Sequence, residues 1–120
     1  KIGYDMQLVH DVHERIAPAD AVALAKGLEP FDLFFLEDPV PLEQLSWLRN
    51  LRQQTSIPIA QGELFNNPYE WRTVIAEQLI NFIRVISARL EELHRRESFR
   101  SLRSSLVFGQ HGTDRGICLR

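Results

Sequence analysis

Short apolar runs alternate with helical patterns through the first 85 residues of the chain. The runs suited to strands cover residues 4–12, 33–36, 57–60 and 81–85. Between them, apolar residues recur at helical spacing after a proline that suits a helix start, and these prolines are Pro18, Pro41 and Pro68. The pattern predicts the order βαβαβαβ. This is an α/β fold amounting to about half of a (β/α)8 barrel of the TIM type, which typically has about 250 residues.

Three carboxylates stand at matching points of this pattern, each where an apolar run ends. They are Asp11, Glu37 and Glu63, and each lies 26 residues from the next. That interval is about the length of one strand–loop–helix–loop unit, so we expect the three side chains at one rim of a parallel barrel or sheet. Three acidic oxygen donors on one rim suit a hard divalent cation. The expected ion is Mg²⁺, with water in the remaining positions.

Alternation along the first strand places a histidine beside this site. Residues two apart on a strand share a face, so Asp11 and His13 are expected to point the same way. A carboxylate ligand with an imidazole beside it offers a cation and an acid–base group in one pocket. Two other interpretations stay open. These residues, with His10 and Glu14, could be ordinary polar groups at a strand end, or His10 and His13 could bind zinc, although the sequence has no Cys or further His at a matching strand end.

Composition narrows the class of protein. The 120 residues allow one domain at most, and the single cysteine, Cys118, excludes an internal disulfide. Without a signal peptide or an apolar run long enough to span a bilayer, the chain is expected in the cytoplasm and without a membrane partner. Residues 1–85 hold 12 acidic and 7 basic residues, whereas residues 86–120 hold 4 acidic and 7 basic residues, all seven of them arginine. We therefore expect a partial barrel domain over residues 1–85 and a tail of different character, rich in Arg and Ser, over residues 86–120.

Four stretches of the first segment carry a family resemblance. They read H-D-V-H-E-R at 10–15, F-F-L-E-D-P at 34–39, G-E-L-F-N-N-P at 62–68 and I-R-V at 83–85. The sequence resembles the enolase superfamily and its mandelate racemase branch. Within that branch it is most similar to the mannonate dehydratase group, which includes the starvation-sensing proteins. The resemblance covers nearly all of residues 3–85 and implies part of the family's C-terminal barrel domain.

The resemblance implies a Mg²⁺-dependent dehydratase (a hydro-lyase) for sugar acids of the mannonate or gluconate class. In such enzymes the substrate carboxylate binds the metal, which stabilises the enediolate formed when the neighbouring proton leaves. Loss of the 3-hydroxyl then gives a 2-keto-3-deoxy acid. Asp11, Glu37 and Glu63 match the metal ligands, and His13 matches the histidine that protonates the departing hydroxyl. Histidine suits that step because its charge changes near neutral pH.

The resemblance also implies machinery that these residues do not contain. It would place a capping domain and a loop tyrosine and arginine before residue 1, and further strands with a W-H-G-P-G-D motif after residue 85. On this basis the chain alone is expected not to catalyse the reaction. Intact family members are expected to be homo-oligomers, and a half-barrel with open sheet edges is expected to pair with another copy.

A change of reading frame would explain the tail. After I-R-V the family continues H-I-S-x-I-G-G-x-T-P-A-R-K-L, whereas this chain reads I-S-A-R-L-E-E-L-H-R-R from residue 86. With one cytosine restored after the codon for Val85, codons for residues 86–99 can be read as H-I-S-K-I-G-G-I-T-P-A-R-K-L. Codons compatible with residues 107–120 likewise contain W-H-G-P-G-D in the neighbouring frame. We therefore predict that residues 86–120 are out-of-frame sequence, from a pseudogene or a sequencing error, and did not evolve to pack.

Taken at face value, the arginines of the tail could form a basic helix that contacts nucleic acid or an acidic partner. These are Arg89, Arg95, Arg96, Arg100 and Arg103. No aromatic interleaving or nucleic-acid motif accompanies them, so a solvated helix or a disordered segment is favoured and no nucleic-acid partner is expected. Three interpretations remain: a degenerate remnant of a dehydratase, an active dehydratase with an error in its reading frame, and a binding module that uses the basic tail. The sequence does not choose among acid sugars.

Overall fold

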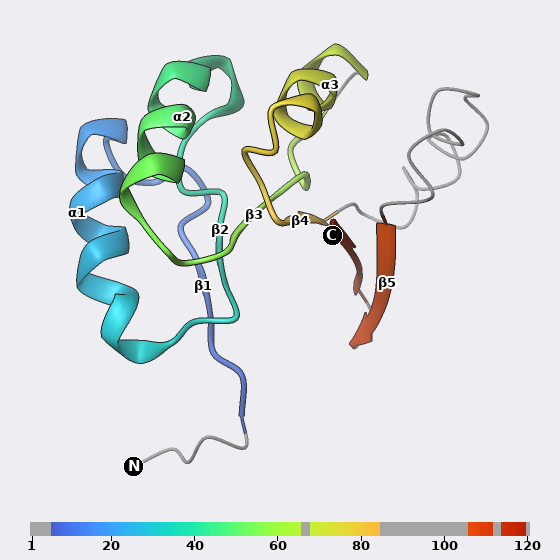
Figure 1. Cartoon of the computed structure of the whole chain (residues 1–120), viewed down its shortest axis with the longest axis horizontal. Coiled ribbons are helices and arrows are strands. Elements are labelled where there is room, and N and C mark those ends of the chain that lie inside the picture. The colour runs from blue at the N-terminus through green and yellow to red at the C-terminus, as the bar shows by residue number, and fades with distance from the viewer. Residues whose placement is uncertain (1–5, 66–67, 85–105, 112–113, 120) are drawn as a thin grey trace.

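Strands and helices alternate through the N-terminal part of the chain, as the sequence pattern predicts (Figure 1). The computed structural model describes residues 6–65, 68–84, 106–111 and 114–119. The elements of the first two ranges are β1 (Val9–Asp11), α1 (Pro18–Leu28), β2 (Phe35–Glu37), α2 (Leu45–Gln54), β3 (Ile59–Gln61), α3 (Pro68–Ala76) and β4 (Phe82–Arg84). Two 3₁₀ turns precede β2 and α2, at Glu29–Phe31 and Leu42–Gln44. Among the described helices, none combines the length and the apolar character that crossing a bilayer requires.

The first four strands pair in parallel in the order β1-β2-β3-β4. Asp11 lies opposite Glu37, and Glu37 lies opposite Ala60. Sequential parallel strands joined by helices are the βαβ arrangement, and they bring the carboxyl ends of the strands to one edge of the sheet. The prediction of a parallel α/β fold is confirmed. The strands are shorter than predicted. For example, β1 begins only at Val9, whereas the predicted strand began at residue 4; residues 4 and 5 lie outside the described residues.

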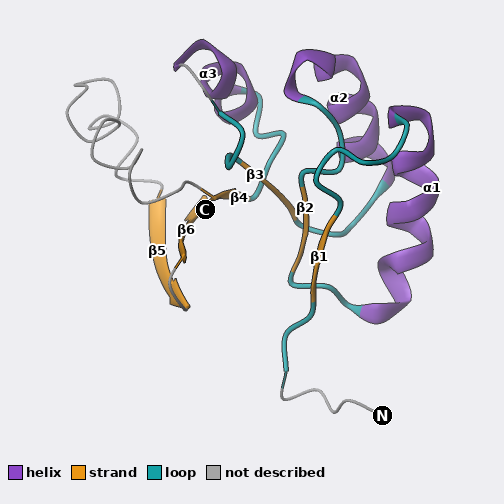
Figure 2. Cartoon of the chain, turned by 180° about the vertical axis from the view of Figure 1, so that it is seen from behind, coloured by secondary structure: helices purple, strands orange, loops and turns teal. Residues whose placement is uncertain are grey.

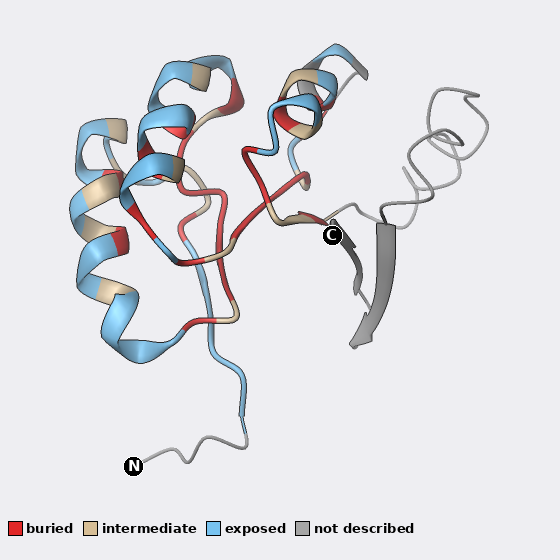
Figure 3. Ribbon diagram, in the orientation of Figure 1, coloured by how far each residue is buried: buried red, intermediate tan, exposed pale blue. Residues whose placement is uncertain are grey.

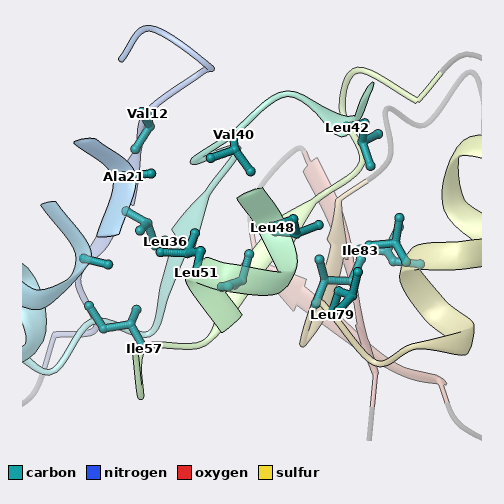
Figure 4. Close-up of a cluster of buried hydrophobic side chains, with 14 of the residues drawn as sticks. Val12, Ala21, Leu36, Val40, Leu42, Leu48, Leu51, Ile57, Leu79 and Ile83 are labelled. Carbon is teal, nitrogen blue, oxygen red and sulfur yellow. The ribbon is translucent and has the colours of Figure 1, made fainter. Parts of the chain in front are cut away.

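Helices α1 and α2 lie against one face of the sheet, and the buried residues gather between them and the strands (Figure 3). Leu36 of β2 is fully buried there, as are Leu48 and Leu51, which stand one helical turn apart on α2. Burying such a side chain contributes about 2 kcal/mol. The cluster drawn in Figure 4 also includes Val12, Ala21, Val40, Leu42, Ile57, Leu79 and Ile83.

The opposite face of the sheet carries aromatic and charged side chains. Phe35 and Phe82 lie with their ring centroids 5.5 Å apart, and Phe34 completes the aromatic group. Alternation along a strand puts Glu37 on the same face as Phe35, and Arg84 on the same face as Phe82. The charged groups at the carboxyl edge therefore lie on the same face of the sheet as this aromatic group.

The sheet continues beyond β4 with two strands from the tail, β5 (Leu106–His111) and β6 (Asp114–Leu119). They form an antiparallel hairpin whose β6 pairs antiparallel with β4, at the far end of the sheet from α1 (Figure 2). The sequence pattern predicted no strands in this part of the tail. The physical reason for the pairing is that the edge of β4 offers N–H and C=O groups to any extended segment. The arginines at 89–103 lie outside the described residues, and the reading-frame hypothesis stays a prediction.

Candidate metal centre

The three carboxylates predicted from their spacing all lie at the carboxyl edge of the parallel strands. Asp11 ends β1, Glu37 ends β2, and Glu63 follows the end of β3 by two residues. Glu37 is only 2% exposed, whereas Asp11 is exposed and Glu63 is half-buried. The equal spacing therefore predicted the edge correctly, and Glu37 is the deepest of the three.

A fourth carboxylate, Asp38, connects two clusters of potential metal ligands in the described residues. Oxygen atoms of Glu37, Asp38 and Glu63 lie within 4.8 Å of one another. Ligand atoms of Asp11, His13 and Asp38 form a second cluster of the same size. The predicted set is thus divided between two clusters that share Asp38. The sequence analysis assigned Asp38 no role. The feature that could have indicated one is its position directly after Glu37, where an apolar strand ends.

The backbone at Asp38 is held in a left-handed conformation, with φ of 41°. Its N–H donates to the carbonyl of Ala60 over 3.0 Å, and its carbonyl accepts from the N–H of Glu14 over 2.9 Å. Aspartate is among the few residues other than glycine that adopt this conformation readily. These two bonds hold the backbone that follows β2 between Ala60 of β3 and the turn after β1.

The electrostatics of the site favour a cation. Burial, and after it the nearby carboxylates with Glu37 first, raise the pKa of Asp38 to about 7. Burial also raises the pKa of Glu37, while Arg84 opposes that rise. Carboxylates gathered in a low-dielectric setting resist ionisation unless positive charge joins them. A divalent ion would supply that charge.

Arg84, the last residue of β4, forms an ion pair with Glu37. Its Nη1 donates to Glu37 Oε2 over 2.8 Å, reaching from β4 to β2. Its guanidinium carbon also lies 5.9 Å from the centre of the Phe35 ring. The resemblance included Arg84 in the I-R-V stretch without a role. The feature that could have indicated a role is its position at the end of the fourth strand, next in order after the three strands that carry the proposed ligands.

Two buried carboxylate oxygens at the site lack a donor. Within the part of the chain that the structure describes, Glu37 Oε1 and Asp38 Oδ2 have no hydrogen-bond partner. Leaving such an acceptor buried and unpaired costs about 1–3 kcal/mol. Oxygen ligands of this kind are the ones that Mg²⁺ binds. The donor set therefore fits the Mg²⁺ that the sequence predicts.

His13 lies beside Asp11, with Nδ1 at 3.7 Å from Asp11 Oδ2. The predicted reason was wrong, because β1 ends at Asp11 and His13 has a positive φ of 51°. The turn after the strand, and not strand alternation, brings the two side chains together. His10 belongs to neither ligand cluster of the described residues, so the zinc interpretation gains no support.

Gly62 permits the close approach that places Glu63. It has a φ of 140°, and a Cβ at this position would clash with the carbonyl oxygen of Arg84. Only glycine adopts this backbone without strain. Gly62 therefore supplies the backbone conformation that the site requires, and Glu63 next to it supplies the carboxylate.

The matches to known proteins cover the part of the chain that carries these site residues. The family model described as enolase C-terminal domain-like matches residues 1–95. A D-galactonate dehydratase family member, RspA of Pantoea ananatis, is 56% identical over 84 residues, which are 70% of this chain and 20% of the relative. A member of the same family from Paenibacillus sp. is 55% identical over 85 residues, 71% of this chain and 21% of the relative. The chain thus spans about a fifth of these relatives, whose names support the dehydratase family and not mannonate specifically.

Solved structures of enolase-type proteins also resemble this chain. An enolase from Pantoea ananatis, crystallised with D-gluconate and Mg, aligns with a TM-score of 0.68 at 55% identity, covering 72% of this chain and 21% of that one. An enolase from Bradyrhizobium, complexed with magnesium and mandelic acid, aligns with a TM-score of 0.64 at 29% identity, covering 81% of this chain and 29% of that one.

Proposed function

The chain belongs to the enolase C-terminal domain-like family, and on this basis we propose that it carries the metal-binding part of a sugar-acid dehydratase. The observation that carries the proposal is the pair of buried, unpartnered carboxylate oxygens on Glu37 and Asp38, among the described residues, at the edge where Glu63 joins them. We take the four parallel strands as part of a (β/α)8 barrel. In barrels of this kind the active site lies at the carboxyl ends of the strands.

The ligands proposed for the metal are Asp11, Glu37 and Glu63, and the metal is Mg²⁺. When bound, it supplies positive charge next to the carboxylate of a sugar acid and to the oxygens that become negative as the neighbouring proton leaves. The Pantoea ananatis structure with D-gluconate and Mg supports both the ion and the class of substrate. Arg84 donates to one oxygen of Glu37, so the other, Oε1, would be available to hold the metal.

His13 is proposed as the acid that protonates the departing 3-hydroxyl. Its imidazole stands at the same edge as the ligands, and the Asp11 carboxylate at 3.7 Å helps to orient the ring. Loss of a proton from C2 and of the 3-hydroxyl removes one water from the acid. The product is a 2-keto-3-deoxy acid.

The substrates proposed are six-carbon sugar acids of the gluconate and mannonate class. The names of the curated relatives add D-galactonate to the acids worth testing. A non-catalytic remnant that keeps the metal site is the second candidate.

Calorimetric titration with D-gluconate tests the proposal. The chain is titrated in saturating Mg²⁺ and again in EDTA, with D-gluconamide as a control ligand that lacks the carboxylate. We expect gluconate to bind only with Mg²⁺, gluconamide not to bind, and Glu37→Gln to abolish gluconate binding. Equal binding with and without Mg²⁺, or no binding at all, would contradict the proposal. A colorimetric assay for the keto acid product then separates a catalytic chain from a remnant.

A further inference from the structure

We propose that Gln61 is a positioning residue whose buried amide holds the loop between β2 and α2 in shape. The loop comprises residues 38–41 and follows a strand at its carboxyl end. In parallel barrels the loops at these ends build the active site. The consequence for substrate binding rests on the proposed function, whereas the hold on the loop is a property of the chain alone.

Gln61 reaches the loop from the face of the sheet that the helices cover. It ends β3 and is 1% exposed. It pairs with Ile83 and stands two residues after Ile59, and both of these belong to the core between the sheet and the helices. Glu37 pairs with Ala60 and lies on the other face. The Gln61 amide is therefore separate from the strand-end carboxylates.

The amide of Gln61 is bonded to the loop at Val40. Its Nε2 donates to the carbonyl of Val40 over 2.6 Å, and Val40 is fully buried. A carbonyl only accepts hydrogen bonds, so the nitrogen of the amide has to face it. Removing this donor would take a hydrogen bond from a buried carbonyl, which is costly.

The oxygen of the same amide shows that packing alone does not explain Gln61. Oε1 is buried, and within the described residues it has no hydrogen-bond partner. Burying an unpaired polar atom is unfavourable, and a methionine would occupy the position without that cost. Departures of this kind from an apolar core are expected where a residue has a second role. The bond to Val40 supplies that role.

The loop depends on such outside bonds for its shape. Pro39 and Pro41 have no N–H to donate, and Asp38 has a positive φ of 41°. Consecutive residues of β3 hold alternate residues of the loop, because the Ala60 carbonyl accepts from the N–H of Asp38 and the Gln61 amide donates to the residue after Pro39. A rarely populated backbone conformation persists only where its surroundings fix it.

The hold extends from the loop to the turn after β1. The carbonyl of Asp38 accepts from the N–H of Glu14 over 2.9 Å, and Glu14 also has a positive φ, of 56°. His13, the residue before it, lies in this turn as well. Loss of the Gln61 amide is therefore expected to loosen Asp38 and Glu14 together.

Amide hydrogen exchange of the whole chain in EDTA, followed by NMR, tests this role. Gln61→Met removes the amide and keeps an unbranched side chain. Gln54→Met is the matched control, because Gln54 is exposed at the end of α2. In Gln61→Met we expect exchange at the N–H groups of Asp38 and Glu14 to speed up by about tenfold or more. In Gln54→Met both rates should stay at their wild-type values.

A reference amide separates the local hold from general stability. The N–H of Asn81 donates to the carbonyl of Ile59, at the other end of β3. Exchange at Asp38 and Glu14 should speed up at least about tenfold more than exchange at Asn81. Equal acceleration at all three amides, or wild-type rates at Asp38 and Glu14, would overturn the proposal.

If Gln61→Met does not fold, the side-chain amide protons of Gln61 in the wild-type chain decide. We expect them to be protected and to exchange at the rate of the Asp38 N–H, because both are released when the loop opens. Free exchange of these side-chain protons would overturn the proposal.

Titration with D-gluconate in saturating Mg²⁺ measures the consequence for the proposed function. Gln61→Met should bind gluconate severalfold more weakly than the wild-type chain, and Gln54→Met should bind it equally well. Wild-type gluconate affinity in Gln61→Met would overturn the positioning role. A wild-type chain that binds no gluconate contradicts the proposed function, whereas the exchange rates in EDTA still decide whether Gln61 holds the loop.

Discussion

Arg84 Nη1 lies 2.8 Å from Glu37 Oε2 and so joins the ends of β4 and β2 across β3. The Glu37 side chain is 3% exposed and that of Arg84 27%. The pair therefore sits inside the site and not on the surface. Removing one member of a buried pair leaves the other charge uncompensated.

Replacing Arg84 with Met should destabilise the metal-free chain by about 3 kcal/mol, because Glu37 would stay buried without its cation. Urea unfolding measures the change. The control is Arg49→Met, which breaks the exposed pair with Glu77 and should cost less. Mg²⁺ should restore part of the stability of Arg84→Met and none of that of Arg49→Met. Equal losses in the two variants would show that the Arg84 pair is not buried in solution.

The stability of the metal-free chain should fall as the pH rises from about 4 to about 7. The folded pKa of Asp38 is raised from 3.8 to about 7, so between these values the folded state keeps a proton that the unfolded state has lost. Stability decreases with pH wherever the native state binds more protons, here by a few kcal/mol across the window. Glu37, with its pKa also raised, acts in the same direction.

Unfolding in urea at several pH values in EDTA measures this slope. Asp38→Asn should flatten it, since the group that titrates is gone, and saturating Mg²⁺ should flatten it in the wild-type chain. The matched control, Asp20→Asn, should keep the wild-type slope. A stability that rises with pH through this range would contradict the burial of Asp38.

Gly62→Ala should destabilise the chain by more than about 2 kcal/mol, because the new Cβ meets the carbonyl of Arg84 and the φ of 140° excludes alanine. Gly27 is the matched control. It lies on α1, where a Cβ would meet nothing within 4 Å, so Gly27→Ala should stabilise the helix by up to about 1 kcal/mol. Thermal unfolding of both variants decides. Similar melting temperatures would mean that β3 and β4 do not approach as closely as the structure has it.

The genomic DNA should contain one more cytosine after the codon for Val85 if the reading-frame hypothesis holds. Sequencing across that codon, and through the bases that encode residues 86–120, tests it. An open frame through W-H-G-P-G-D would establish an intact dehydratase gene. The present frame, read again without the extra base, would favour the degenerate remnant.

The parallel order of the strands and the edge that carries Asp11, Glu37 and Glu63 could be predicted from sequence. Apolar runs ending in an acidic residue at equal spacing report the βα repeat directly. The role of Asp38 could not be predicted in this way. Whether its carboxylate faces solvent or its neighbours depends on its left-handed backbone, on the hydrogen bond it donates to Ala60 of β3 and on the one it accepts from Glu14, beyond the end of β1.

Other differences have similar causes. The strand alternation predicted for His13 failed because β1 ends at Asp11, a boundary set by pairing with β2 and not by local pattern. The pairing of β6 with β4 could not be predicted because it depends on a free sheet edge, which is a property of the fold and not of the tail.

A calorimetric Mg²⁺ titration of the wild-type chain beside Glu37→Gln is the most direct test of the metal centre. Glu37 is the deepest of the strand-end carboxylates, and its Oε1 has no other partner among the described residues. We predict one Mg²⁺ site in the wild-type chain and a loss of about a hundredfold in affinity in Glu37→Gln. Equal affinity in the two proteins would contradict a metal centre at this edge of the sheet.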